Sequence, residues 1–326
     1  MVVATQSLIF TEKIEAIELP IIDLSADRSK VSKLIVKACE KYGFFKVINH
    51  GVPHDTISKL EQESLSFFSK PFPQKQRSGP ANPFGYGCKT IGFNGDVGEV
   101  EYILLHTNPH SIAQCSKTLS CNPIKFSSAV IGYIEAIRRL ACEILELMAD
   151  GLWVSETSVF SRLIRDVDND SIFRLNHYPP FCTQNRDASP RNITKIGFGE
   201  HTDPQILTLL RSNDVCGLQI SLEPGVWVPV PPDPTAFWIN VGDVLQVMTN
   251  ERFKSVKHRA ITNSLESRMS MAYFAAPPLG AKITALPETV TPERPPLYRA
   301  FTWAEYKKTV YALRLGDNRS NLYRLP

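Results

Sequence analysis

The sequence has no apolar run of the roughly 18 residues that a membrane-spanning helix requires. Residues 1–20 also lack the basic segment, apolar segment and cleavage site of a secretory signal peptide. The net charge is only +3, from 36 Lys and Arg against 33 Asp and Glu, and the basic residues form no stripe of the kind that binds nucleic acid. We therefore expect a soluble, cytoplasmic protein that binds neither nucleic acid nor membranes.

Cysteine pairs with metal-binding or redox spacing are missing as well. The seven cysteines are widely spaced and include no CxxC pair, which excludes a zinc ribbon and argues against a disulfide framework. Cys39 and Cys142 fall on apolar helix faces, where a free cysteine acts as a small buried hydrophobic group. Cys182 and Cys216 lie in predicted loops, and no function is assigned to them. No glycine-rich phosphate-binding pattern opens a helix.

The chain does contain enough apolar residues, 43%, to bury a large core. Amphipathic periodicity predicts helices over residues 27–42, 54–69, 126–153 and 302–315. Proline, glycine and asparagine are frequent in residues 71–96, which predicts a long loop that covers a site.

Short β-forming runs dominate the chain after residue 170, and turn-forming residues separate them. Because no helices alternate with these runs, we expect a jelly roll of seven or eight antiparallel strands rather than a doubly wound sheet. The fold class is thus mainly β with flanking helices, and residues 126–153 form a long scaffold helix. The expected divisions are 1–122 (N-terminal region), 123–169 (scaffold helix and connection), 170–280 (β core) and 281–326 (C-terminal helical extension).

Three residues in the β region have a pattern that suits a metal. His201 and Asp203 stand at i and i+2 in GEHTDPQ, so on a strand or its extended exit both side chains point to one face. His258, in KSVKHRA, lies on a distant strand and completes a set of two histidines and one carboxylate. Such a set leaves three octahedral positions open, as in non-haem Fe(II) oxygenases. From the pair alone, the alternative is that His201 caps a turn and Asp203 stabilises the turn before Pro204.

A second pattern indicates an anion-binding site. Arg268 and Ser270 also stand at i and i+2, within a run, RMSMAYF, that should be buried. A buried arginine is costly unless an anion pairs with it, and a guanidinium beside a hydroxyl suits a carboxylate. The sequence offers no obvious internal partner, so a bound dicarboxylate is the expected one.

The chain resembles the plant 2-oxoglutarate- and Fe(II)-dependent dioxygenases, and most closely the gibberellin 2-oxidases. The resemblance covers nearly the whole chain and is specific because nine motifs occur together: IELPIIDLS, GFFKVINHGVP, NHYPP, GEHTDPQILTLL, GLQI, WVPVPP, INVGDVLQVMTN, KSVKHRA and RMSMAYF. It implies a double-stranded β-helix, in agreement with the strand pattern. It also implies that His201, Asp203 and His258 hold Fe(II) and are the catalytic residues.

The same resemblance implies a binding site for 2-oxoglutarate. Tyr178, Arg268 and Ser270 would bind its far carboxylate, and Asn176 would contact it near the metal. The implied reaction converts 2-oxoglutarate and O2 to succinate and CO2 while a C–H bond of the substrate is hydroxylated. Ascorbate is expected to support activity.

Two other histidines are not assigned to the metal site. His50 lies in a turn, in INHGVP, where a structural role is expected. His177 should face the opposite side of its strand from Asn176 and Tyr178. Without the resemblance, Tyr178 would be interpreted as an aromatic residue that packs on the prolines after it.

The expected substrate follows from residues 82–105, which resemble the corresponding region of gibberellin 2-oxidases that act on C19 gibberellins. The implied reaction is 2β-hydroxylation, which inactivates the hormone. Gibberellins are apolar polycycles that bear a carboxylate, so the site should combine apolar walls with a cation or hydroxyl donors. Candidate walls and cations, none of them assigned, are Tyr86, Tyr102, Phe274, Lys89, Lys307 and Lys308.

Two other readings stay open at this point. A related dioxygenase that acts on another gibberellin position, a flavonoid or an auxin would share every motif for iron and 2-oxoglutarate. A non-catalytic jelly roll that binds a hormone is the second alternative, although such a protein would not need an open metal face beside an anchor for 2-oxoglutarate. Self-association is possible, but no heptad pattern requires it.

Overall fold

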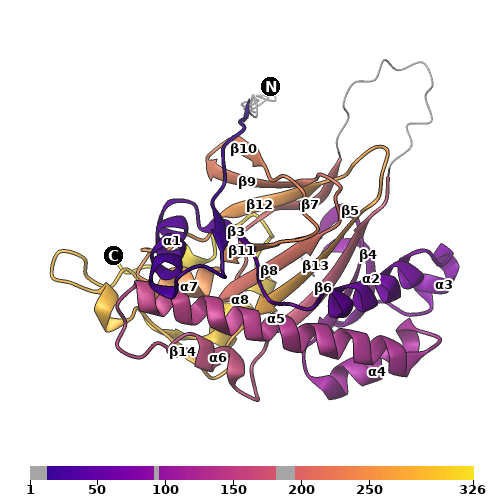
Figure 1. Ribbon diagram of the computed structural model, residues 1–326, viewed down its shortest axis with the longest axis horizontal. Coiled ribbons are helices and arrows are strands. Elements are labelled where there is room, and N and C mark those ends of the chain that lie inside the picture. Colours follow the sequence, from indigo (N-terminus) through magenta and orange to yellow (C-terminus); the bar gives the residue numbers. More distant parts are fainter. Residues whose placement is uncertain (1–12, 92–94, 181–194) are drawn as a thin grey trace, which may run out of the picture.

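The computed structural model describes residues 13–91, 95–180 and 195–326. Two large β-sheets and a layer of helices make up the molecule (Figure 1). The strands are β1 (Lys13–Ile14), β2 (Ile21–Asp23), β3 (Phe44–Ile48), β4 (Gly85–Ile91), β5 (Asp96–His106), β6 (Ile172–Tyr178), β7 (Ile196–His201), β8 (Leu207–Ser212), β9 (Leu218–Glu223), β10 (Val226–Pro229), β11 (Phe237–Val241), β12 (Lys257–Ile261), β13 (Arg268–Ala275), β14 (Lys282–Ile283) and β15 (Phe301–Thr302).

Strands β6 to β13 form a jelly roll, as the sequence predicts. In the larger sheet the strand order is β2-β3-β11-β8-β13-β6-β5-β4, and in the smaller one it is β1-β10-β9-β12-β7. Side chains from both sheets share one hydrophobic cluster, in which Leu210 and Trp238 of the larger sheet meet Leu218 and Ile220 of the smaller one. The two sheets therefore face each other across a common interior.

Side-chain alternation divides the larger sheet into an outer and an inner face. On β13, Met269, Met271 and Tyr273 belong to the main hydrophobic core beside the helices. Arg268 and Ser270 take the alternate positions and line the cavity between the sheets, because successive side chains of a strand point to opposite faces. One strand thus supplies both an apolar core and a polar site.

Helices cover the outer face of the larger sheet, and α5 runs along it in Figure 1. On α5, buried residues recur at helical spacing from Phe126 to Ala149, so a long apolar face packs on the sheet. The helices are α1 (Arg28–Lys41), α2 (His54–Phe68), α3 (Phe72–Gln76), α4 (Pro109–Leu119), α5 (Pro123–Gly151), α6 (Ser161–Arg165), α7 (Asp243–Met248) and α8 (Trp303–Ala312).

The predicted scaffold and C-terminal helices are confirmed with small shifts of their ends. Helix α5 begins three residues earlier than expected because Asn122 caps it, its side chain accepting a hydrogen bond from the backbone N–H of Lys125. Helix α8 begins after Thr302, which forms a capping box with Glu305. It packs back on the fold, with Trp303 and Tyr306 buried.

The prediction of a loop over residues 71–96 is wrong in part. This segment contains α3 and β4, and β4 pairs with β5 at the edge of the larger sheet. The glycines and prolines argue locally against a strand, but pairing with a neighbouring strand overrides that preference. Helix α4 was not predicted either.

The run AFWINVGDVLQVMT is one of the β-forming runs after residue 170, but only its first part is a strand. The strand β11 ends at Val241, and Gly242 begins the short helix α7. A Cβ atom on Gly242 would lie 2.0 Å from the carbonyl oxygen of Gln205, so the chain passes close to the segment that carries Asp203. The turn is set by this tertiary contact, which local propensity does not reveal.

Several predictions about single residues can be compared with the structure. Cys39 and Cys142 are buried as expected, Cys216 is exposed, and Cys182 lies outside the described residues. His50 has the expected structural role, since its Nδ1 accepts a hydrogen bond from the backbone N–H of Val52.

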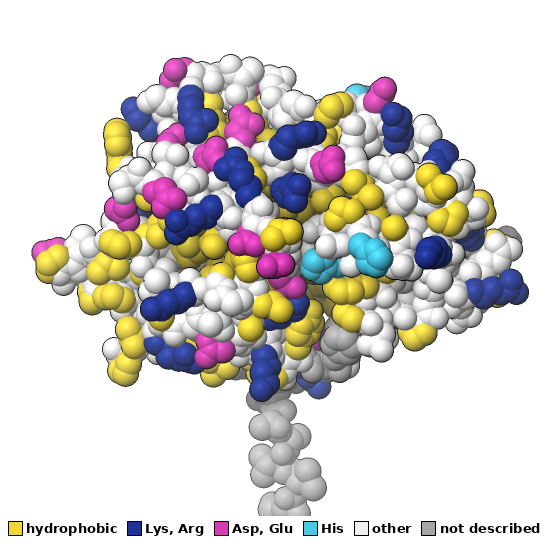
Figure 2. Space-filling view, turned by 90° about the horizontal axis from the view of Figure 1, so that it is seen from below, with side chains coloured by type: hydrophobic (Ala, Val, Ile, Leu, Met, Phe, Trp, Pro, Cys, Tyr) yellow, Lys and Arg dark blue, Asp and Glu magenta, His cyan; other side chains and the backbone are white. Residues whose placement is uncertain are grey.

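No helix in the described ranges is long and apolar enough to cross a membrane. On the face that Figure 2 shows, basic and acidic side chains lie interspersed.

A buried ion pair on the outer face holds β4, β5 and β6 together. The Glu101 carboxylate accepts hydrogen bonds at 2.7 Å from Lys75 Nζ and Tyr86 Oη, and His177 Nδ1 lies 2.7 Å from it. His177 therefore points away from Asn176 and the cavity, as the strand alternation predicts. Burial alone would raise the pKa of Glu101, but the hydrogen bonds from His177, Lys75 and Tyr86 outweigh burial and lower that pKa from its usual 4.5.

Glu101→Gln is expected to lower the free energy of unfolding by about 3 kcal/mol at pH 7, because it leaves the Lys75 ammonium buried without a counterion. A depressed carboxyl pKa adds stability above the unfolded value, near 4.5, and this stability is lost as pH falls below that value. Urea denaturation at pH 7 and pH 4 should show a smaller difference at pH 4. Glu156→Gln, at an exposed ion pair with Arg162, is the control. An equal loss in both variants would contradict the prediction.

Candidate active site

The three predicted metal ligands meet at one point between the sheets. His201 ends β7 and His258 lies directly opposite it on β12. Asp203 Oδ1 is 3.7 Å from His201 Nε2 and 3.6 Å from His258 Nε2. All three ligand atoms lie within 4.8 Å of one another, and they form the group of potential metal ligands found among the described residues. Asp203 is only 1% exposed, so the carboxylate is directed inward rather than solvated.

Backbone hydrogen bonds orient both imidazoles for a metal. His201 Nδ1 lies 2.8 Å from the carbonyl oxygen of Gly199, and His258 Nδ1 lies 3.3 Å from that of Val256. Each Nδ1–H donates to its carbonyl, which leaves Nε2 with a free lone pair toward the common point. Burial is the main cause that holds the pKa of His201 well below its usual range, and the neighbouring His258 is the second cause. The ring is therefore neutral, the form that binds a metal.

Adjacent strands bring the predicted 2-oxoglutarate residues together. Arg268 pairs with Tyr178, and Ser270 pairs with Asn176, between β13 and β6. The Arg268 guanidinium lies 5.4 Å from the centre of the Tyr178 ring, and Asn176 Nδ2 donates to Ser270 Oγ at 3.4 Å. All four residues line one cavity with the metal triad.

Arg268 has the buried, unbalanced charge that the sequence indicates. It is 2% exposed, and burial lowers the pKa of its guanidinium, yet an arginine this basic stays charged. No carboxylate in the described part of the chain forms an ion pair with it. A carboxylate ligand would supply the missing counterion, so the geometry fits a dicarboxylate that reaches from Arg268 to the metal.

The cavity has a volume of about 490 Å³, within the range of small-molecule sites. Of the candidate wall residues, Tyr102 and Phe274 line it, and Tyr86 instead donates its hydroxyl to Glu101 outside it. Of the candidate cations, Lys307 lines the cavity, whereas Lys89 and Lys308 are exposed and do not.

Comparison with known proteins agrees with this geometry. Residues 169–277 match the 2OG-Fe(II) oxygenase superfamily, and residues 19–109 match the N-terminal family of a non-haem dioxygenase in morphine synthesis. Gibberellin 2-beta-dioxygenase 4 of Arabidopsis thaliana is 56% identical over 96% of this chain and 98% of its own length. Gibberellin 2-beta-dioxygenase 1 of Pisum sativum is 51% identical over 94% of this chain and 90% of its own length. The chain belongs to the gibberellin 2-beta-dioxygenase family.

Solved structures of other dioxygenases share the fold of this gibberellin 2-beta-dioxygenase family member. JOX2, crystallised with 2OG, Fe and JA, is 27% identical with a TM-score of 0.81, over 98% of this chain and 92% of its own. The rice dioxygenase for auxin oxidation is 26% identical with a TM-score of 0.77, over 94% of this chain and 100% of its own. The predicted Fe(II), 2-oxoglutarate and double-stranded β-helix are thereby confirmed, and the chain is an Fe(II)/2-oxoglutarate-dependent dioxygenase.

A buried network around Asp243 holds the segment that carries Asp203. The backbone N–H of Asp243 donates to the carbonyl oxygen of Asp203 at 2.8 Å. The Asp243 carboxylate accepts hydrogen bonds from Thr202 Oγ1 at 3.2 Å and Tyr306 Oη at 2.8 Å. Arg319 Nη2 donates to the carbonyl oxygen of Thr202 at 2.8 Å. Contacts from α7, α8 and the C-terminal segment thus fix the two residues that follow His201.

Sequence reasoning missed Asn240, which donates from Nδ2 to Asp203 Oδ2 at 3.3 Å and is 2% exposed. The motif INVGD contained this asparagine, but nothing in the sequence places it beside Asp203.

Asn240→Leu is expected to weaken metal binding about 10- to 100-fold, because the hydrogen bond that orients the Asp203 carboxylate is lost. Calorimetric titration with Co(II) in place of Fe(II) measures this directly. Asn263→Leu, at an exposed turn, is the matched control. Unchanged Co(II) affinity in the Asn240 variant would mean that other contacts suffice to orient Asp203.

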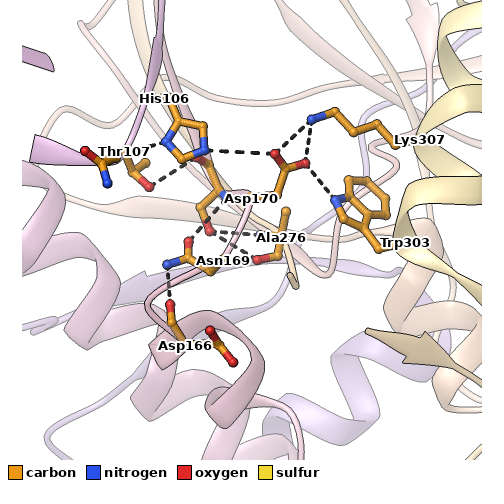
Figure 3. A network of polar contacts seen from close by, with 10 residues as sticks. His106, Thr107, Asp166, Asn169, Asp170, Ala276, Trp303 and Lys307 are labelled. Carbon is orange, nitrogen blue, oxygen red and sulfur yellow. Dashed lines mark hydrogen bonds and ion pairs between the residues drawn. The ribbon is translucent and has the colours of Figure 1, made fainter. Parts of the chain in front are cut away.

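A second polar network, shown in Figure 3, includes three residues that line the same cavity, Asp170, Trp303 and Lys307. Asp170 Oδ2 accepts hydrogen bonds from Lys307 Nζ at 2.7 Å and from Trp303 Nε1 at 2.8 Å. His106 Nε2 lies 3.9 Å from the other carboxylate oxygen. Lys307 is therefore neutralised by Asp170, and the network ties α8 to the beginning of β6.

Proposed function

We propose that this chain hydroxylates C19 gibberellins at the 2β position and thereby inactivates the hormone. The observation that carries this proposal is the 56% identity to gibberellin 2-beta-dioxygenase 4 over nearly the whole of both chains. Two dioxygenases that share the fold, JOX2 and the rice auxin dioxygenase, are only 27% and 26% identical. The gibberellin family is thus favoured over an auxin or flavonoid enzyme.

In this proposal His201, Asp203 and His258 hold Fe(II) on one face and leave the rest of its coordination shell open. Arg268, with Tyr178 and Ser270, binds the far carboxylate of 2-oxoglutarate. When bound, Fe(II) supplies the site at which O2 is activated and oxidation of 2-oxoglutarate is coupled to C–H hydroxylation.

The remaining cavity suits an apolar, rigid substrate. The exposed area of its walls is mostly apolar, as an apolar ligand requires. The apolar side chains that line it include Leu104, Ile172, Phe198, Leu210, Phe274 and Val310. The apolar wall positions the substrate relative to the metal site, so the shape of this wall decides which carbon is hydroxylated.

An aerobic assay with Fe(II), ascorbate and 2-oxoglutarate tests the proposal. Each of a panel of C19 gibberellins, a flavanone and an indole acid is incubated with the enzyme, and succinate and product mass are measured. We expect one added oxygen on a C19 gibberellin, at C2 by NMR. Turnover of another panel member alone would overturn the substrate assignment. Gibberellin binding without succinate formation would instead indicate the non-catalytic alternative.

A further inference from the structure

Arg174 is one of several buried cations that line the cavity, and the roles proposed so far do not use it. It lies on the inner face of β6, two residues before Asn176, and is 9% exposed. Its guanidinium stacks on the Tyr102 ring at 3.7 Å and on the Phe198 ring at 4.9 Å. The two aromatic rings hold the charged group in place without neutralising it.

The hydrogen bonds of Arg174 are incomplete. Nε donates to Asn176 Oδ1 at 2.7 Å. Nη2 is buried and has no hydrogen-bond partner among the residues that the structure describes. No carboxylate in the described part of the chain pairs with the guanidinium, and burial lowers its pKa. A buried donor and a buried charge that both lack a partner are costly unless a ligand completes them.

The other cations that line the cavity already have partners or assigned roles, so Arg174 remains for a further anion. The far carboxylate of 2-oxoglutarate is assigned to Arg268, and its near carboxylate to the metal site. Arg259 donates to Gln219 Oε1, and Arg319, beside the Asp243 carboxylate, donates to the carbonyl oxygen of Thr202. Lys307 is already paired with Asp170 (Figure 3). Arg174 lies near the metal-ligand triad, because Phe198 packs on both Arg174 and the His201 ring, the latter at 4.6 Å.

We propose that Arg174 binds the carboxylate of the substrate, and so requires the substrate to be an apolar acid rather than a neutral molecule. This inference rests on the proposed function, which supplies an apolar polycycle with one carboxylate. The Tyr102 and Phe198 rings then pack on the apolar part of the substrate, while Nη2 donates to the carboxylate. Arg174 is a specificity-determining residue that fixes which end of the substrate faces the metal.

The test compares a C19 gibberellin with its methyl ester. The wild-type enzyme should convert the free acid with a kcat/KM roughly 10- to 100-fold higher than the ester, the range that a charge-assisted hydrogen bond supplies. In Arg174→Met this preference should fall to about 1, with most of the loss in the acid. Arg174→Lys keeps the charge and should retain part of the preference.

Two further measurements separate a binding role from a structural one. Lys307→Met is the matched control, because it removes a cavity cation already paired with Asp170, and it should keep the preference for the acid. The KM for 2-oxoglutarate should change less than threefold in Arg174→Met. Anaerobic calorimetry with Mn(II) and 2-oxoglutarate present should show the same loss of acid preference in binding.

The outcomes distinguish this inference from the function on which it rests. If the wild-type enzyme hydroxylates no gibberellin, the proposed function fails. If it converts acid and ester equally well, only the inference about Arg174 is overturned. A large rise in the KM for 2-oxoglutarate in Arg174→Met, with the acid preference unchanged, would assign Arg174 to the co-substrate instead. If Arg174→Met does not fold, the Arg174→Lys variant decides instead, and an acid preference equal to that of the wild type would likewise overturn the inference.

Discussion

His201→Ala should reduce hydroxylation by at least roughly 10³-fold and leave the fold intact, because one of three protein ligands to Fe(II) is lost. Nε2 of His201 lies 3.7 Å from Asp203 Oδ1, and no other histidine or carboxylate within the described ranges joins this group of ligands. Succinate and hydroxylated product are measured together, since uncoupled oxidation of 2-oxoglutarate would form succinate alone.

The control for this prediction is His110→Ala, an exposed histidine on α4, which should keep wild-type turnover. Co(II) titration and urea denaturation of both variants separate loss of the metal from loss of the fold. Iron-dependent turnover near the wild-type rate in His201→Ala would remove this residue from the metal site.

Arg268→Met should raise the KM for 2-oxoglutarate roughly 100-fold, because the variant lacks the charged partner of the far carboxylate. The same variant without co-substrate should be as stable as the wild type or more stable, since the buried guanidinium has no carboxylate counterion within the described ranges. Saturating 2-oxoglutarate should raise the Tm of the wild type and leave the Tm of the variant nearly unchanged.

A shortened co-substrate makes the second prediction specific. The wild type should prefer 2-oxoglutarate strongly over 2-oxobutanoate, which lacks the far carboxylate, and Arg268→Met should lose most of that preference. Arg162→Met, at an exposed ion pair with Glu156, is the control and should behave as the wild type. A variant at Arg268 with an unchanged KM for 2-oxoglutarate would place the far carboxylate elsewhere.

Residue patterns were sufficient for the parts of the site that depend on strand alternation. His201 and Asp203, like Arg268 and Ser270, are two residues apart, and that spacing alone puts each pair on one side of the chain. Arg174 has the same relation to Asn176 and Tyr178, so the alternation of β6 could have revealed it. It was missed because a single arginine in an apolar run has no visible partner until the neighbouring strands are in place.

Other features depend on contacts between distant segments. The pairing of Lys307 with Asp170 joins residues 137 positions apart, and it decides which cavity cation is neutralised. Asn240 reaches Asp203 across 37 positions. Strand β4 forms within a segment of loop-like composition because the edge of the larger sheet pairs with it.

The sequence by itself predicted the jelly roll, the three candidate metal ligands that the structure groups together and the burial of Arg268. These follow from the period of the strands and from the cost of burying a charge, both of which act within a few residues. Only the tertiary structure decided which cations remain unpaired in the cavity and which groups orient the ligands. Charge pairing and hydrogen bonding depend on distance in space, and the packing of the two sheets and α8 sets those distances.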